Sequence, residues 1–186
     1  WSYDTLTPEL QDIFLTLSVF ENSFTEDAAT ALSGIKHTPL LLQNLKDRSL
    51  VLLDLVGGTS RYQLLDTIRD YVSQKIDLSQ KERLRQRHAA YYYHLVKQSL
   101  RHIHGEHQEQ WLDRLEMEHG NLRMCLDFLT GTKVGLRMTS ALHQFWYVHG
   151  HLEEGLYYME KLMTHCHDAT PKMQSSVLNG MGVFAW

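Results

Sequence analysis

The sequence lacks the features that mark secreted and membrane-embedded proteins. Its 186 residues include two cysteines, Cys125 and Cys166, which form neither a ligand pair nor a disulfide framework. The apolar runs, such as Leu50-Val51-Leu52-Leu53, fall far short of the ~20 residues that a membrane-spanning helix needs, and no secretory signal is visible. These absences predict a soluble protein of the reducing cytoplasm.

The sequence also lacks recognisable catalytic motifs. It has no phosphate-binding loop of the Gly-x-x-x-x-Gly-Lys-Ser/Thr type. No serine or cysteine has a recognisable base partner. We therefore predict no catalytic residue, no enzymatic activity and no bound cofactor in this chain. The start at Trp1 without a methionine and the apolar run that ends at Trp186 indicate a piece of a longer protein.

Residues 1–78 carry the pattern of three short helices and a β-hairpin. Thr7, Thr25 and Pro39 each stand where a helix is expected to begin, and apolar residues follow at helical spacing. Two short strands are then predicted, one within Leu50–Val56 and one around Tyr62–Leu64, with Gly57-Gly58 in the turn between them. Together these elements predict a winged helix-turn-helix domain.

Residues 79–186 read as helical throughout, which makes the expected fold mainly α. Ser79 and Glu82 have the spacing of a capping box at the start of a helix that runs to about Arg101. We assign residues 79–130 to a helical connector. Residues 131–186 are predicted to form tetratricopeptide-like helical repeats, with turns at Thr130-Gly131-Thr132 and at Gly150.

Short phrases spread over nearly the whole chain point to a known family. They are Trp1-Ser2-Tyr3-Asp4, Leu17-Ser18-Val19-Phe20, Phe24-Thr25, Lys46-Asp47-Arg48-Ser49-Leu50, Tyr62 to Tyr71, Arg87-His88-Ala89-Ala90-Tyr91, Trp111-Leu112, Glu118-His119-Gly120-Asn121-Leu122-Arg123, and Phe145-Trp146-Tyr147 with Gly150. In this ordered set the chain resembles the regulatory half of bacterial STAND ATPases of the NB-ARC type, which are transcriptional regulators with winged-helix and tetratricopeptide segments.

The resemblance implies an ATPase domain before Trp1, with ATP or ADP as its cofactor, and further repeats after Trp186. It also implies that the repeats sense a protein or a small molecule and that the winged helix transmits this state to the ATPase domain. The family's Met-His-Asp motif, whose histidine touches ADP, aligns here with Leu64, Leu65 and Asp66. Leucine donates no hydrogen bond, so direct phosphate sensing is not expected.

Asp66 and Arg69 remain as the residues that the resemblance places against the absent nucleotide domain. A local role is the alternative. In that interpretation Asp66 caps a helix that begins at Thr67, and Arg69 forms an ion pair on the surface of this helix.

Direct DNA binding by the winged helix is a second functional hypothesis. Residues 1–78 contain six basic and eleven acidic side chains, a net charge of -5, whereas DNA binding depends on neutralising phosphates. The would-be recognition helix, Pro39 to Asp47, is also rich in leucine. We therefore expect little direct contact with DNA.

A metal-dependent enzyme is a third hypothesis, because the chain has twelve histidines. Three local groups stand out: His102-Ile103-His104 with His107, His149-Gly150-His151, and His165-Cys166-His167. Their spacings match no established metal-binding signature, so we predict no native metal site.

Aromatic residues and the C-terminal helix give two further expectations. Tyr91-Tyr92-Tyr93 and Phe145-Trp146-Tyr147 are predicted to supply core packing, with one or two rings of each group turned inward. Gly180 and Gly182 are expected to allow close helix packing. Phe184 and Trp186 lack a following helix to cover them, so we expect a homodimer through this helix.

Overall fold

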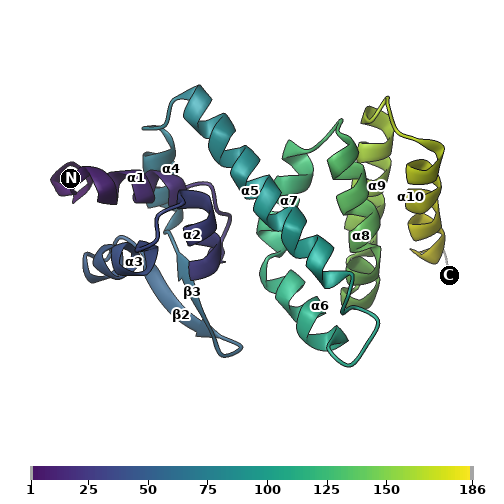
Figure 1. Ribbon diagram of the computed structural model, residues 1–186, viewed down its shortest axis with the longest axis horizontal. Helices are drawn as coiled ribbons and strands as arrows, with labels where there is room; N and C mark the ends of the chain where they lie inside the picture. The colour runs from purple at the N-terminus through teal and green to yellow at the C-terminus, as the bar shows by residue number, and fades with distance from the viewer. Residues whose placement is uncertain (1, 185–186) are drawn as a thin grey trace. The chain divides into compact units, whose positions relative to one another are not determined.

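The computed structural model describes residues 2–184, and its contacts divide the chain after Tyr91 into two compact units (Figure 1). The first unit is a winged helix-turn-helix and the second is a helical array, which confirms the predicted fold class. The division falls inside α5 (Leu78–Ser99), so the first half of this helix packs with the winged helix. None of the described helices is both long enough and apolar enough to cross a membrane.

The first unit contains the following elements up to α5: η1 (Ser2–Thr5), α1 (Pro8–Leu17), β1 (Ser23–Thr25), α2 (Glu26–Ser33), α3 (Thr38–Asp47), β2 (Leu52–Val56), β3 (Thr59–Gln63) and α4 (Asp66–Ser73). The predicted helix starts are confirmed at α1 and α2. The Thr7 hydroxyl accepts a hydrogen bond from the Leu10 amide at 3.4 Å, and the Thr25 hydroxyl accepts one from the Ala28 amide at 3.2 Å. Pro39 lies in the first turn of α3, where its missing amide hydrogen costs nothing.

The three strands form one antiparallel sheet in the order β1-β3-β2. β1 is absent from the sequence prediction, because three residues are too short to show an alternating pattern. It pairs Phe24 with Tyr62, whose rings stack with centroids 6.1 Å apart, and the Phe20 ring stacks on Phe24 at 4.4 Å. These rings, with the buried leucines of α1 to α3, form the core of the unit.

The β2–β3 hairpin is the wing, and it closes through a two-residue turn. Gly57 and Gly58 have φ values of 56° and 77° and lie between the paired residues Val56 and Thr59. Positive φ at both turn residues suits glycine and matches the twist of the strands. The wing leaves Leu52, Leu55 and Val56 exposed by 43%, 74% and 44%, so part of its apolar run faces solvent.

The structure corrects the predicted cap of α4. The helix begins at Asp66 itself and is preceded by Leu65, whose side chain makes no capping hydrogen bond. Asp66 therefore occupies the first helical turn, where its charge favours the helix dipole without capping. The proposed Asp66 cap on a helix starting at Thr67 is wrong because the turn into the helix occurs one residue earlier than expected.

The predicted capping box of α5 is displaced by two residues. The helix begins at Leu78, and the Asp77 carboxylate accepts hydrogen bonds from the Gln80 amide and the Ser79 hydroxyl, both at 2.8 Å. The Gln80 side chain accepts from the Asp77 amide at 3.4 Å, which completes a box of the same kind. Asp77 and Gln80 thus perform the function predicted for Ser79 and Glu82.

The second unit continues from α5 with α6 (Gln108–Met117), α7 (His119–Phe128), α8 (Lys133–His149), α9 (Leu152–His165) and α10 (Pro171–Phe184). α8 packs against both α9 and α10, and α9 also packs against α10. Gly150 ends α8 in the left-handed conformation with φ of 77°, and α9 follows after one more residue. The predicted helical hairpin is thereby confirmed, and the boundary predicted at residue 130 falls just before α8.

Most of the packing predictions for the second unit are confirmed. Tyr92, Phe145 and Trp146 are almost fully buried, whereas Tyr147 is half exposed. A Cβ at Gly180 would lie 3.0 Å from the Met159 side chain, so this glycine does permit close packing. At Gly182 a Cβ would meet no atom within 4 Å, so the same prediction is wrong there. Phe184 is partly buried, and Trp186 lies outside the described residues.

Candidate functional site

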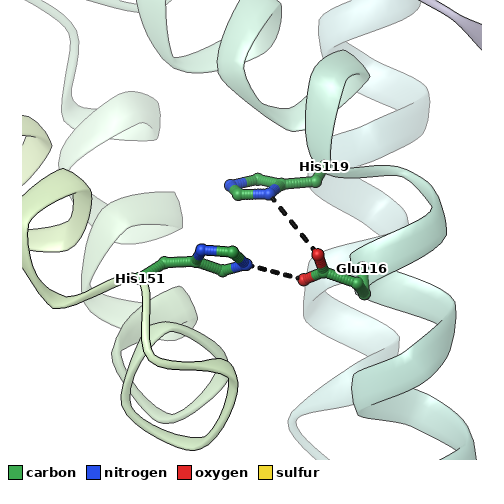
Figure 2. Close-up of side chains that lie close together, drawn as sticks. All are labelled: Glu116, His119 and His151. Carbon is green, nitrogen blue, oxygen red and sulfur yellow. Dashed lines mark hydrogen bonds and ion pairs between the residues drawn. The ribbon is translucent and has the colours of Figure 1, made fainter.

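Three side chains of the second unit converge where two pairs of helices turn (Figure 2). Glu116 lies in the last turn of α6, and His119 is the first residue of α7. His151 directly precedes α9, because Gly150 ends α8 and reverses the chain there. Among residues 2–184, this is the only group of three or more histidine, cysteine or acidic side chains that lie close enough together to hold a metal ion.

Figure 2 shows both imidazoles directed at the Glu116 carboxylate. The distance from Glu116 Oε2 to His151 Nε2 is 2.9 Å, and that from Glu116 Oε1 to His119 Nδ1 is 4.0 Å. One nitrogen or oxygen from each residue lies within 4.8 Å of the other two. The two imidazole rings have centroids 4.3 Å apart, and all three residues are partly exposed.

A second layer of polar contacts holds His119. Its Nε2 lies 2.6 Å from Glu154 Oε1, and Arg123 Nε donates to Glu154 Oε2 at 2.7 Å. Burial alone raises the pKa of Glu154, but the hydrogen bonds from His119 and Arg123 outweigh it and lower this pKa to about 2. The hydrogen bond to Glu154 in turn raises the pKa of Arg123. Glu154 is therefore a fixed anion behind His119.

A third histidine of this region, His149, also lies near Glu116, on the same carboxylate oxygen as His151. His149 Nδ1 is 3.7 Å from Glu116 Oε2, and its buried Nε2 has no hydrogen-bond partner among the described residues. The Phe145 ring lies 5.3 Å from the rings of both His119 and His149 and 5.7 Å from that of His151. This buried phenylalanine gives the cluster an apolar side wall.

The sequence identified only part of this cluster. His149 and His151 were one of the three predicted histidine groups, but Glu116 and His119 were not connected with them. Their spacing, Glu-x-x-His across a short helix break, was the available signal. The other two groups do not gather into such a site among the described residues: His102 stacks on Trp111, and Cys166 hydrogen-bonds Asp168.

The structure places the predicted contacts, Asp66 and Arg69, on α4 of the first unit. Arg69 forms ion pairs with Glu21 at 3.0 Å and with Asp66 at 3.2 Å. The Arg69 side chain is 20% exposed and the Asp66 side chain 80%. The predicted surface pairing of Arg69 is thus present, and this arginine ties α4 to the segment before β1. A contact with a nucleotide domain stays a prediction.

The second unit also contains a cavity of about 600 Å³ next to α8 and α10. Its lining combines apolar side chains, hydroxyl groups and three cations; the residues are Leu100, Lys133, Leu136, Arg137, Ser140, Ala141, Thr170, Lys172, Met173 and Ser176. Lys133 pairs with Asp168 at 2.9 Å, and the Ser140 and Ser176 hydroxyls hydrogen-bond across the two helices at 2.5 Å. A ligand with an anionic group and an apolar part would suit this composition.

Comparison with known proteins finds relatives of one description. The chain is 31% identical over 173 residues to a Mycobacterium bovis protein and to two Mycobacterium tuberculosis proteins, each named "Putative HTH-type transcriptional regulator". The match covers 88% of this chain but 19% of each relative, so the chain spans about a fifth of their length. No family model and no solved structure matches.

Proposed function

We propose that this chain is a non-catalytic regulatory part of a multidomain transcriptional regulator, in which a winged helix is coupled to helical sensor repeats. The observation that carries the proposal is the combination of a winged helix with a helical array. The chain that contains them is similar to about a fifth of the length of proteins that are named as transcriptional regulators. The resemblance to NB-ARC-type STAND proteins supplies the finer proposal. In it, a preceding ATPase domain binds ATP or ADP in the cytoplasm, and the helical hairpins are tetratricopeptide-like.

The surface of the winged helix favours contact with protein over contact with DNA. On α3 the leucines Leu41, Leu42 and Leu45 are buried, so they form core and cannot read a groove. The wing exposes Leu52, Leu55 and Val56, an apolar surface that suits a protein partner better than phosphates. Together with the net charge of -5 over residues 1–78, this supports docking of the wing on the ATPase domain that the resemblance implies.

The cavity beside α8 and α10 is the proposed place for the signal on the repeats. Its three cations, Lys133, Arg137 and Lys172, favour an anionic group, while Leu136 and Met173 favour an apolar portion. A signal bound there would act on the winged helix only if its affinity differed between two states of the whole protein.

Nucleotide turnover by the full-length regulator tests the docking role of the wing. Leu55→Lys places a charge on the apolar surface, and we expect it to change ATP turnover at least threefold. Leu78→Lys, a matched change at a position that is 87% exposed in the same unit, serves as the control and should leave turnover unchanged. Equal ATP turnover in both variants and the wild type would show that the wing has no part in coupling to the ATPase domain.

Direct DNA binding is the alternative function, and the relatives' description as helix-turn-helix regulators keeps it open. A titration of this chain with duplex DNA at several salt concentrations distinguishes the two functions. Tight binding with a steep salt dependence would indicate phosphate neutralisation and favour the DNA-binding alternative. We expect weak binding. We also expect no ATP binding by the isolated chain, and a micromolar dissociation constant for ATP would contradict the non-catalytic assignment.

A further inference from the structure

We propose that Glu116, His119 and His151 bind a divalent transition metal ion of the zinc type at the corner where α6 meets α7 and α8 meets α9 (Figure 2). Such a site goes beyond the regulatory function proposed above and does not depend on it. It also revises the expectation, drawn from histidine spacing alone, that the chain has no native metal site.

The donor set suits zinc. Imidazole nitrogen and carboxylate oxygen are both common zinc ligands, and two histidines with one glutamate form a known three-ligand set that leaves a fourth position for water. Carboxylates alone would favour magnesium or calcium, but two imidazoles shift the preference to zinc, nickel, copper or cobalt. The chemistry therefore points to a borderline transition metal with three protein ligands.

The spacing of the donor atoms also suits one shared ion. Ligand bonds of about 2.0–2.1 Å at tetrahedral angles place neighbouring donor atoms about 3.4 Å apart. The distances from Glu116 to the two other proposed ligands, 2.9 Å to His151 and 4.0 Å to His119, lie on either side of that value. Since all three donor atoms lie within 4.8 Å of one another, we expect side-chain rotation to bring them around one ion.

Glu154 prepares His119 for this role. In metal sites, a ligating histidine usually donates its other ring N–H to a carboxylate, which fixes the tautomer and the ring orientation. Here Glu154 Oε1 lies 2.6 Å from His119 Nε2; a carboxylate only accepts, so this nitrogen donates the hydrogen bond and Nδ1 is the ring nitrogen that faces Glu116. Arg123 holds the other oxygen of Glu154, which keeps the carboxylate in place. An unspecific surface histidine would need no such support.

A bound ion would join two parts of the helical array that are distant in sequence. Glu116 and His119 lie on either side of the α6–α7 corner, whereas His151 lies 32 positions beyond His119 at the α8–α9 corner. An ion that binds the folded unit in preference to the unfolded chain stabilises it by mass action. The site is therefore expected to make the thermal stability of the chain depend on zinc.

The experiment is a zinc titration of the chain after removal of any affinity tag, followed by calorimetry or by competition with a chromogenic chelator. We expect one ion per chain with a dissociation constant of about 1 µM or lower. His119→Ala and His151→Ala should each weaken binding at least 100-fold. Glu154→Gln, which keeps the shape but loses the charge, should weaken it about 10- to 100-fold, as other outer-shell changes do.

The control is the double variant His165→Ala/His167→Ala, which removes two exposed histidines from the His-Cys-His group of the same unit. It should bind zinc as the wild type does. Circular dichroism checks that each variant folds, and a cobalt(II) absorption spectrum reports the donor set independently of affinity. Loss of the visible cobalt bands in His119→Ala but not in the control would support the site.

Two results would overturn the proposal. One is the absence of stoichiometric binding by the wild type at 10 µM zinc, which would leave the three residues as an ion-pair cluster. The other is binding that survives His119→Ala and His151→Ala but disappears in the His165/His167 variant, which would assign the metal to exposed histidines. A folded Glu154→Gln variant with unchanged affinity would likewise contradict the orienting role of Glu154.

Discussion

Replacement of Tyr92 by phenylalanine should destabilise the helical unit, because the hydroxyl of Tyr92 serves a buried carboxylate. Tyr92 is fully buried on α5 and donates a hydrogen bond to Glu118 Oε2 at 2.8 Å. Glu118, between α6 and α7, is 3% exposed, and Asn121 Nδ2 donates to the same oxygen at 3.0 Å. A carboxylate so far from water needs such donors, because a buried polar group without hydrogen-bond partners is costly.

The expected loss follows from the chemistry of this contact. Phenylalanine has the shape of tyrosine without the hydroxyl, so the substitution leaves the surrounding packing intact. Hydrogen bonds to charged groups contribute about 1.5–3 kcal/mol, and the loss is largest where the acceptor stays buried. Asn121 remains as a donor, so we predict that Tyr92→Phe costs about 2 kcal/mol.

Urea unfolding followed by circular dichroism measures this cost. With a typical slope of about 2 kcal/mol per molar urea, the midpoint should fall by about 1 M. The control is Tyr93→Phe, the neighbouring and partly exposed tyrosine, which should change stability by less than about 0.5 kcal/mol. In a Glu118→Gln background, Tyr92→Phe should cost clearly less, since the acceptor is then neutral. Equal effects of Tyr92→Phe and Tyr93→Phe would refute the reasoning.

Two further predictions concern the start of α5 and the glycines of the array. Asp77→Ala should lower the urea midpoint more than Ser79→Ala, because the Asp77 carboxylate accepts from the Gln80 amide as well as from the Ser79 hydroxyl. The hydrogen bond from the Gln80 amide lowers the pKa of Asp77, so the cap contributes above the ordinary aspartate pKa and is lost as the pH falls through the lowered value; stability measured from pH 6 to 2 would reveal this loss. Gly135→Ala should lower the free energy of unfolding by about 1–2 kcal/mol, since the new Cβ would lie 2.5 Å from the Leu129 carbonyl oxygen. Gly182→Ala should instead stabilise α10 by about 0.5–1 kcal/mol, because its Cβ would meet no atom within 4 Å; thermal unfolding that shifts both variants alike would contradict this.

The starts of α1 and α2 could be predicted from the local sequence, whereas the start of α5 could not. Thr7 and Thr25 were predicted correctly because the residues after them favour a first helical turn, Pro8 after Thr7 and two acidic residues after Thr25. Near residue 78 the sequence offered two boxes, Asp77 with Gln80 and Ser79 with Glu82, and both satisfy the same spacing rule. Which of the two caps α5 depends on where the chain leaves α4, and that is decided by packing within the first unit.

Strand β1 illustrates a second limit. Its three residues carry no periodic signal, and they become a strand only because β3 offers its edge to Ser23, Phe24 and Thr25. The wing itself was predictable, since two adjacent glycines follow an apolar run and precede a second segment of strand length, a pattern typical of a tight hairpin. The exposure of Leu55 was not, because an apolar run indicates burial until the neighbouring elements are known.

The sequence by itself determined the class of this protein: a winged helix at the N-terminal side, helices after it, an acidic balance over residues 1–78 and no phosphate loop. Periodicity, caps and turn glycines encode these properties locally. Only the tertiary structure brought His151 to Glu116 and His119, and only it showed Glu154 fixing the orientation of His119. Metal ligands must converge in space, and convergence over 30 residues depends on how α8 and α9 pack, which no local pattern records.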